Sequence, residues 1–120
     1  MHKGMNWISH RDRQILHLDF TDLTPEEIDQ LYQNARAEID KQPKSSVLLL
    51  STISSKTQAS RATKERGKEF AKQNTPYLKK SALVGASKLF KVIVSGFALA
   101  TGRDIKVLGS ETEALDWLVD

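Results

Sequence analysis

The sequence predicts an α/β protein: a mixed, mostly parallel five-stranded sheet with flanking helices, in the order ββαβαβαβα. Three observations predict it. Short apolar runs of strand length alternate with segments whose apolar residues recur at helical spacing. Serine or threonine residues suited to cap a helix precede three of the helical segments. Strands that alternate with helices are typical of parallel sheets covered by helices.

The first two strands are predicted at residues 6–9 and 14–20, joined by a polar turn. In the second strand, from Leu16 to Phe20, large apolar side chains alternate with polar ones, which is the period of a half-buried strand. We therefore expect an N-terminal hairpin at the edge of the sheet.

The first helix has a clear start. Thr24 can cap its free amides, Pro25 suits the first helical position, and Glu27 completes a capping box. One apolar face follows at helical spacing: Ile28, Leu31, Tyr32, Ala35 and Ile39. The helix is predicted to end before Pro43.

The middle of the chain combines a buried strand with a basic segment. Residues 46–50 form a continuous apolar run, as expected for a central strand that is covered on both faces. A helix with a thin apolar stripe is predicted at residues 57–74. Residues 56–80 carry eight basic and two acidic side chains in a chain of net charge +3. We expect a solvated helix face rather than a specific nucleic-acid site, because only Phe70 and Tyr77 interleave with the basic residues.

A short buried strand is predicted at residues 82–85, followed by a helix at residues 87–101 that Ser87 caps and Gly102 ends. This helix is apolar on several sides: Leu89, Phe90, Val92, Ile93, Phe97 and Ala100. Its apolar stretch is too short and too interrupted to span a bilayer, so no transmembrane segment is expected. A buried helix is expected, and the alternatives are the wall of a lipophilic pocket or a homodimer interface.

A last strand at residues 104–108 and a last helix complete the chain. That helix is predicted to begin at a second capping box, formed by Ser110 and Glu113. Since no repeat or linker interrupts the sequence, we expect a single domain over residues 1–120.

Composition narrows the classes of function. The chain contains no cysteine, and its N-terminus lacks the apolar core of a signal peptide, so a cytoplasmic protein is expected. No phosphate-binding glycine loop, G-x-S-x-G elbow or H-E-x-x-H helix occurs. His2, His10 and His17 lack ligand spacing and are expected to be ordinary surface or strand residues. The sequence predicts no catalytic residue, no metal site, no cofactor and no enzyme activity.

Three segments carry a family resemblance: residues 80–87 (KSALVGAS), 102–108 (GRDIKVL) and 113–118 (EALDWL). The apolar helix between the first two segments belongs to the same pattern. They resemble the SpoIIAA-like family, small bacterial proteins related to the STAS and CRAL-TRIO folds. The resemblance covers nearly the whole chain and implies that α/β fold, together with a regulatory role in binding.

In the family's namesake, an anti-sigma-factor antagonist, a serine between the third strand and the following helix is phosphorylated in an Asp-Ser-Ser-Gly-like setting. The corresponding residues 51–57 read Ser-Thr-Ile-Ser-Ser-Lys-Thr here. Hydroxyl groups are therefore present, whereas the aspartate and the glycine of that setting are not.

The candidate site lies in the two loops that follow the central strand and its expected neighbour. In open α/β sheets, ligands bind beyond the carboxyl ends of parallel strands, where helix N-termini present free amides. The candidate residues for binding a partner or for phosphorylation are Ser51, Ser54, Ser55, Lys56, Thr57, Gly85, Ser87 and Lys88. Helix capping alone is the competing interpretation of these residues.

Two functions are compatible with the sequence. The first is a regulatory or binding module that docks a partner protein or a small anionic ligand at these loops. The alternative is a carrier or sensor of a lipid or another hydrophobic small molecule, bound under the helix at residues 87–101.

Overall fold

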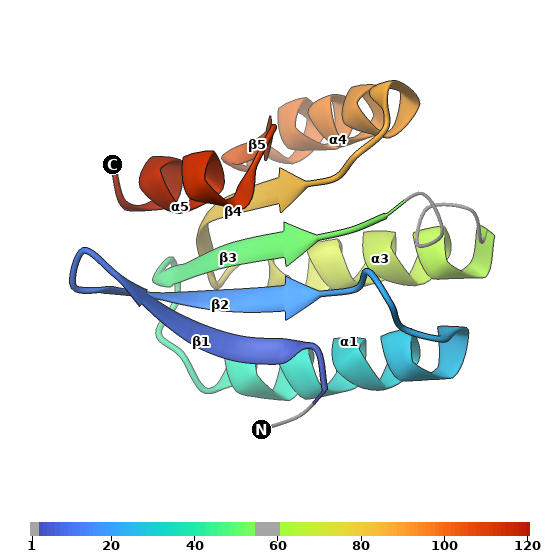
Figure 1. The fold of residues 1–120 in the computed structure, drawn as a ribbon, viewed down its shortest axis with the longest axis horizontal. Helices are drawn as coiled ribbons and strands as arrows, with labels where there is room; N and C mark the ends of the chain where they lie inside the picture. The colour runs from blue at the N-terminus through green and yellow to red at the C-terminus, as the bar shows by residue number, and fades with distance from the viewer. Residues whose placement is uncertain (1–2, 55–60) are drawn as a thin grey trace.

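The computed structural model describes residues 3–54 and 61–120, with the backbone alone for residues 61–64. The elements follow the predicted order: β1 (Met5–His10), β2 (Arg13–Asp19), α1 (Pro25–Asp40), β3 (Val47–Thr52), α3 (Arg61–Asn74), β4 (Leu78–Val84), α4 (Lys88–Thr101), β5 (Ile105–Leu108) and α5 (Glu111–Val119). The five strands form one sheet in the order β1-β2-β3-β4-β5 (Figure 1). β1 pairs antiparallel with β2 and the other neighbours pair parallel, which confirms a mixed, mostly parallel sheet edged by a hairpin.

Apolar side chains fill the space on both faces of the sheet. The larger core lies between the sheet and the helices α1 and α3, and it includes Leu16, Leu18 and Phe70. The smaller core lies between the sheet and α5: Ile15, Leu48, Leu50, Ala82, Ala114 and Leu118. β3 contributes to both cores, which explains its continuous apolar run.

The predicted helix starts are confirmed where a side chain caps the backbone. The hydroxyl of Thr24 accepts from the amide of Glu27 at 3.2 Å, and the Glu27 carboxylate accepts from the Thr24 amide at 2.9 Å. Ser87 and Ser110 each accept a hydrogen bond from the amide three residues further on. Gly102 ends α4 in the left-handed conformation, with φ of 69°.

The strand bounds differ from the prediction by one or two residues, except in β4, where the difference is larger. β4 begins at Leu78 rather than at residue 82, because the segment that carries its lysines already pairs with β3. The ammonium of Lys80 donates to the carbonyl oxygens of Trp117 and Asp120 at 3.0 and 3.1 Å. α3 runs from Arg61 to Asn74, and the first residues of the predicted helix lie outside the described residues.

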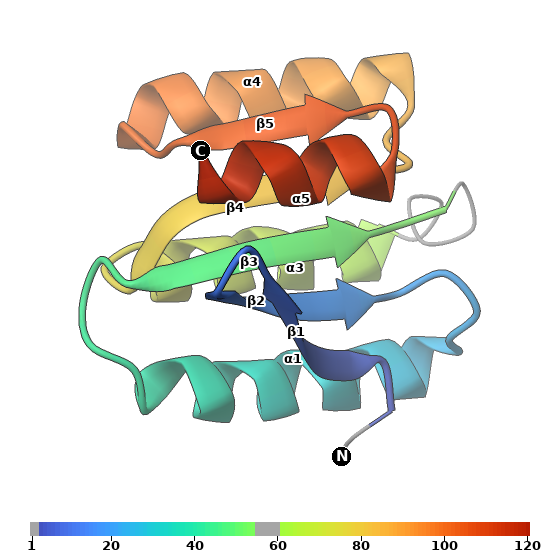
Figure 2. The same cartoon turned by 60° about the vertical axis from the view of Figure 1, so that its left-hand side comes forward.

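α4 lies at the β5 end of the sheet, far from α1, which lies at the opposite end (Figures 1 and 2). The expectation of a buried helix is wrong. No residue of α4 is fully buried, and the exposed fractions are 70% for Leu89, 68% for Val92, 51% for Ile93 and 87% for Leu99. The sheet ends at β5, so the chain covers α4 from one side only. In the described part of the chain, no helix combines the length and apolarity needed to cross a membrane.

Candidate functional site

The described parts of the two predicted binding loops, residues 51–54 and 85–87, lie side by side at the carboxyl edge of the sheet. The amide of Ile53 donates to the carbonyl oxygen of Val84 at 2.9 Å, which joins the end of β3 to the end of β4. Gly85 follows with φ of 95°, and a side chain there would collide with the carbonyl oxygen of Ile53. Glycine is therefore required at this position for the loops to approach each other.

The described candidate residues mostly make structural contacts. Ser51 is half-buried at the end of β3, and the Ser54 hydroxyl donates to the carbonyl oxygen of Thr21 at 3.3 Å. The Ser87 hydroxyl caps α4, and Lys88 is exposed in its first turn. The remaining predicted residues lie outside the described residues: Ser55, Lys56 and Thr57.

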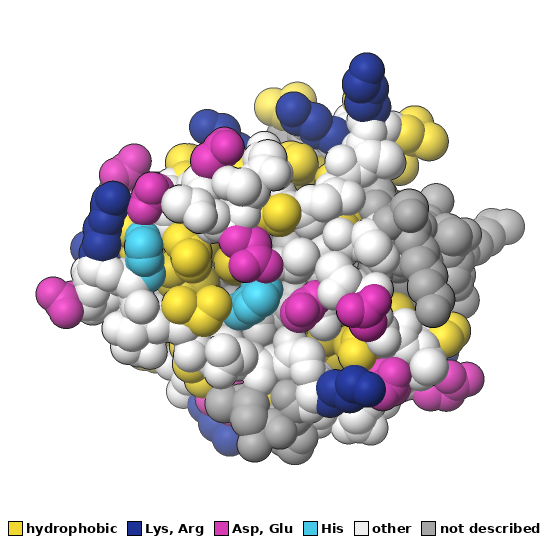
Figure 3. Space-filling view, in the orientation of Figure 1, with side chains coloured by type: hydrophobic (Ala, Val, Ile, Leu, Met, Phe, Trp, Pro, Cys, Tyr) yellow, Lys and Arg dark blue, Asp and Glu magenta, His cyan; other side chains and the backbone are white. Residues whose placement is uncertain are grey.

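The outward side of α4 is a continuous apolar surface, which we call the α4 surface. It consists of Leu89, Val92, Ile93, Gly96 and Leu99. These positions recur at helical spacing and therefore share one side of the helix. The helix has 14 residues and is about 21 Å long, and the α4 surface covers about 15 Å of it, from Leu89 to Leu99. Yellow side chains at the upper edge of Figure 3 mark the region where Figure 1 places α4.

The inward side of α4 contacts the rest of the molecule through two aromatic side chains and through an arginine. Phe90 packs against the larger core, and the guanidinium of Arg103 lies 6.0 Å from the ring centroid of Phe97. Arg103 also donates to the carbonyl oxygen of Ala71 and to the hydroxyl of Ser81. Burial lowers the pKa of this guanidinium. Arg103 therefore connects α3, β4 and α4 beneath the exposed surface.

Both described histidines connect the sheet to α5. Nε2 of His17 lies 2.9 Å from the Thr52 hydroxyl, which donates to the Glu111 carboxylate at 3.1 Å. Nε2 of His10 lies 2.9 Å from the carboxylate of Asp116. In Figure 3 each cyan histidine lies beside a magenta carboxylate. The sequence predicted ordinary surface or strand residues; both histidines do lie in strands, but their contacts with α5 were not predicted.

With both contacts made, the hydrogen bonds around Thr52 run in the opposite direction to those of a base-activated nucleophile. A hydroxyl has one proton, and Thr52 donates it to Glu111. His17 must therefore donate to the Thr52 oxygen, whereas a catalytic base would accept from it. Among the described residues, no three His, Asp or Glu side chains gather closely enough to hold a metal ion.

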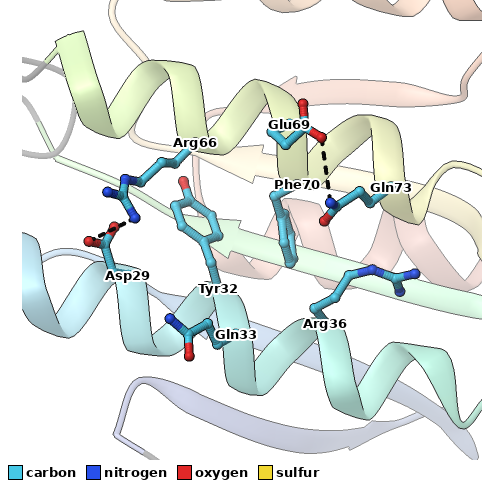
Figure 4. Close-up of a pocket in the computed structure, with 8 residues that line it drawn as sticks. All are labelled: Asp29, Tyr32, Gln33, Arg36, Arg66, Glu69, Phe70 and Gln73. Atoms are coloured by element: carbon cyan, nitrogen blue, oxygen red, sulfur yellow. Dashed lines mark hydrogen bonds and ion pairs between the residues drawn. The ribbon is translucent and has the colours of Figure 1, made fainter.

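A shallow groove runs between α1 and α3 (Figure 4). The ring of Tyr32 packs between those of Phe20 and Phe70, with centroids 5.2 and 4.9 Å away. Burial, followed by the nearby charge of Asp29, raises the pKa of Tyr32 to about 12. An ion pair of 3.0 Å between Arg66 and Asp29 crosses the groove. Its volume of about 200 Å³ is below the range of roughly 300–1,000 Å³ typical of small-molecule sites, so the groove is a packing seam.

The elements and their pairing define an α/β fold with one mixed, mostly parallel five-stranded sheet. Neither the protein-family models nor the curated proteins contain a match to the sequence. Among solved structures, the chain is similar to an uncharacterized protein of the DUF3478 family from Shewanella loihica PV-4, which has a SpoIIAA-like fold. The TM-score is 0.73 at 16% identity, over 95% of this chain and 91% of that chain. This likeness confirms the predicted fold.

Proposed function

We propose that the protein is a non-enzymatic binding module that docks a partner protein on the α4 surface and the loop preceding it. The exposure of four large apolar side chains on one side of α4 supports this proposal. Soluble proteins rarely expose contiguous apolar patches that serve no contact. Burying each such side chain completely contributes roughly 1.5–3 kcal/mol, so a partner that covers them gains binding free energy.

In this proposal, residues 51–54 and 85–87 support the start of α4. Because the Ile53 amide and Gly85 fix the two loops against each other, the start of α4 is fixed as well. The Ser87 hydroxyl already accepts from the amide of Phe90, and a small anion would compete with it. A protein partner therefore has more support than a small anionic ligand.

A carrier of a hydrophobic small molecule is the second candidate. No residue of α4 is fully buried, and Phe90 and Phe97 lie half-buried on its inward side. A ligand under the helix would contact these rings. In that case Phe97→Asp would abolish retention of a bound lipid in native mass spectrometry, whereas Leu99→Asp would leave it unchanged.

Site-specific photo-crosslinking in the host cell tests the proposed function. A benzophenone amino acid at Leu99, which is exposed on α4, should give discrete protein adducts that mass spectrometry can identify. The same probe at the exposed residue Thr112 of α5 is the matched control and should give none of these adducts. Identical adduct patterns from both positions, or no protein adduct from Leu99, would refute partner docking on α4.

A further inference from the structure

Three exposed charges around α4 are placed unfavourably for a single copy of the chain, whereas the half-buried Arg103 at the C-terminal end packs its guanidinium against Phe97. Lys88 and Lys91 lie in the first turns, and the helix has no acidic residue in its first turn and no basic residue in its last. Asp104 is exposed two residues after the C-terminal cap Gly102. A helix carries partial positive charge at its N-terminus and partial negative charge at its C-terminus. Each of these side chains therefore lies near the end of α4 that carries its own sign.

Gly96 gives a second, independent observation. It lies near the midpoint of the α4 surface, and a Cβ built on it would meet no atom of the described residues within 4 Å. Glycine inside a helix is unfavourable relative to alanine. Gly85 is required by a close contact within the chain, but no contact of this kind involves Gly96. A second helix approaching the α4 surface closely would make use of the missing side chain.

We infer that the partner is a second copy of this chain, packed through α4 as an antiparallel pair with two-fold symmetry; this rests on the proposed docking function of the α4 surface. In such a pair every contact occurs twice. Lys88 of each copy lies beside Asp104 and the negative helix end of the other copy. The apolar side chains cover one another, and the two backbones approach near Gly96.

The charge layout favours a second copy over an acidic helical peptide. A negatively charged peptide would pair with Lys88 and Lys91, but it would bring like charge to Asp104. The antiparallel pair satisfies both ends of the helix at once. Two helices of about 21 Å bury less than the roughly 800 Å² per partner of a standard interface. The dimer is therefore weak, with a dissociation constant in the micromolar range.

Sedimentation velocity on the full chain measures this directly. Over a concentration series from about 1 μM to about 1 mM, wild type should pass from monomer to dimer. Leu99→Asp should raise the dissociation constant at least roughly 30-fold, because it places a charge among the apolar side chains of the contact, one turn from Gly96. Lys68→Glu changes a charge on the exposed side of α3 and should shift the constant less than about twofold. Circular dichroism confirms that both variants are folded.

Charge reversal tests the antiparallel arrangement. Lys88→Glu and Asp104→Lys should each weaken the dimer roughly three- to tenfold, because each brings like charges together in both symmetric contacts. The double variant restores opposite charges and should recover most of the loss. Additive weakening in the double variant would overturn the antiparallel pair.

The outcomes also separate this inference from the proposed function. A wild type that stays monomeric over the whole concentration series overturns the second copy as partner. If Leu99 then crosslinks to a different protein, docking on the α4 surface stands and only its partner changes. If Leu99 gives no protein adduct either, both ideas fail.

Discussion

α1 and α4 are helices of similar length, but the more polar helix is the more deeply buried of the two. α1 is rich in charged and polar residues and buries four side chains completely: Ile28, Leu31, Ala35 and Ile39. α4 is mostly apolar and buries none. The sheet and α3 surround the apolar stripe of α1, whereas α4 lies at the end of the sheet beside β5. Position in the fold, rather than composition, decides how much of a helix is buried.

The largest expected effect contrasts a buried with an exposed leucine. Leu31→Ala should lower the free energy of unfolding by roughly 2–5 kcal/mol, because it removes a side chain that is 1% exposed and leaves a cavity. Leu99→Ala, at 87% exposure, should change it by less than about 0.5 kcal/mol. Urea denaturation at low protein concentration measures both values. Equal losses would show that α4 is covered within a single chain.

Alkaline pH should destabilise the α1 side of the molecule. The pKa of Tyr32 is raised to about 12 in the folded chain from 10.0, chiefly by burial. Its contribution to stability is therefore fully present below pH 10 and lost as the pH rises through about 12. A shift of this size corresponds to about 3 kcal/mol. Denaturation midpoints between pH 9 and pH 12 measure it, with Tyr32→Phe as the variant that lacks this loss.

The smallest expected change in the free energy of unfolding comes from replacing a glycine by alanine. Gly96→Ala should raise the free energy of unfolding of the monomer by roughly 0.5–1 kcal/mol, because alanine favours the helix and meets no neighbouring atom. Gly85→Ala should lower it, since its Cβ would collide with the Ile53 carbonyl. Thermal unfolding of dilute protein compares the two variants. A loss of stability in Gly96→Ala would reveal a contact within the chain.

Sequence patterns predicted the features that depend on residues close together in the sequence. The caps at Thr24, Ser87 and Ser110 are local signals, and the order of elements follows from the spacing of apolar residues. The exposure of α4 was not predictable, because periodicity shows which side chains share a face but not which face is covered. The contacts of His17 and His10 join residues 35 and 106 positions apart, and no local motif marks them.

An exposed apolar helix and an exposed edge strand associate with other chains through different groups. The backbone amides and carbonyls of α4 are bonded within the helix, so its exposed side offers side chains alone and cannot template added strands. The free backbone of the sheet edge lies next to it in β5, which has only four residues and carries Lys106. Short length and a charge are the features by which edge strands resist aggregation. The molecule can thus expose apolar side chains of α4 for reversible association. A longer β5 at the same end of the sheet would favour edge-to-edge pairing into fibrils.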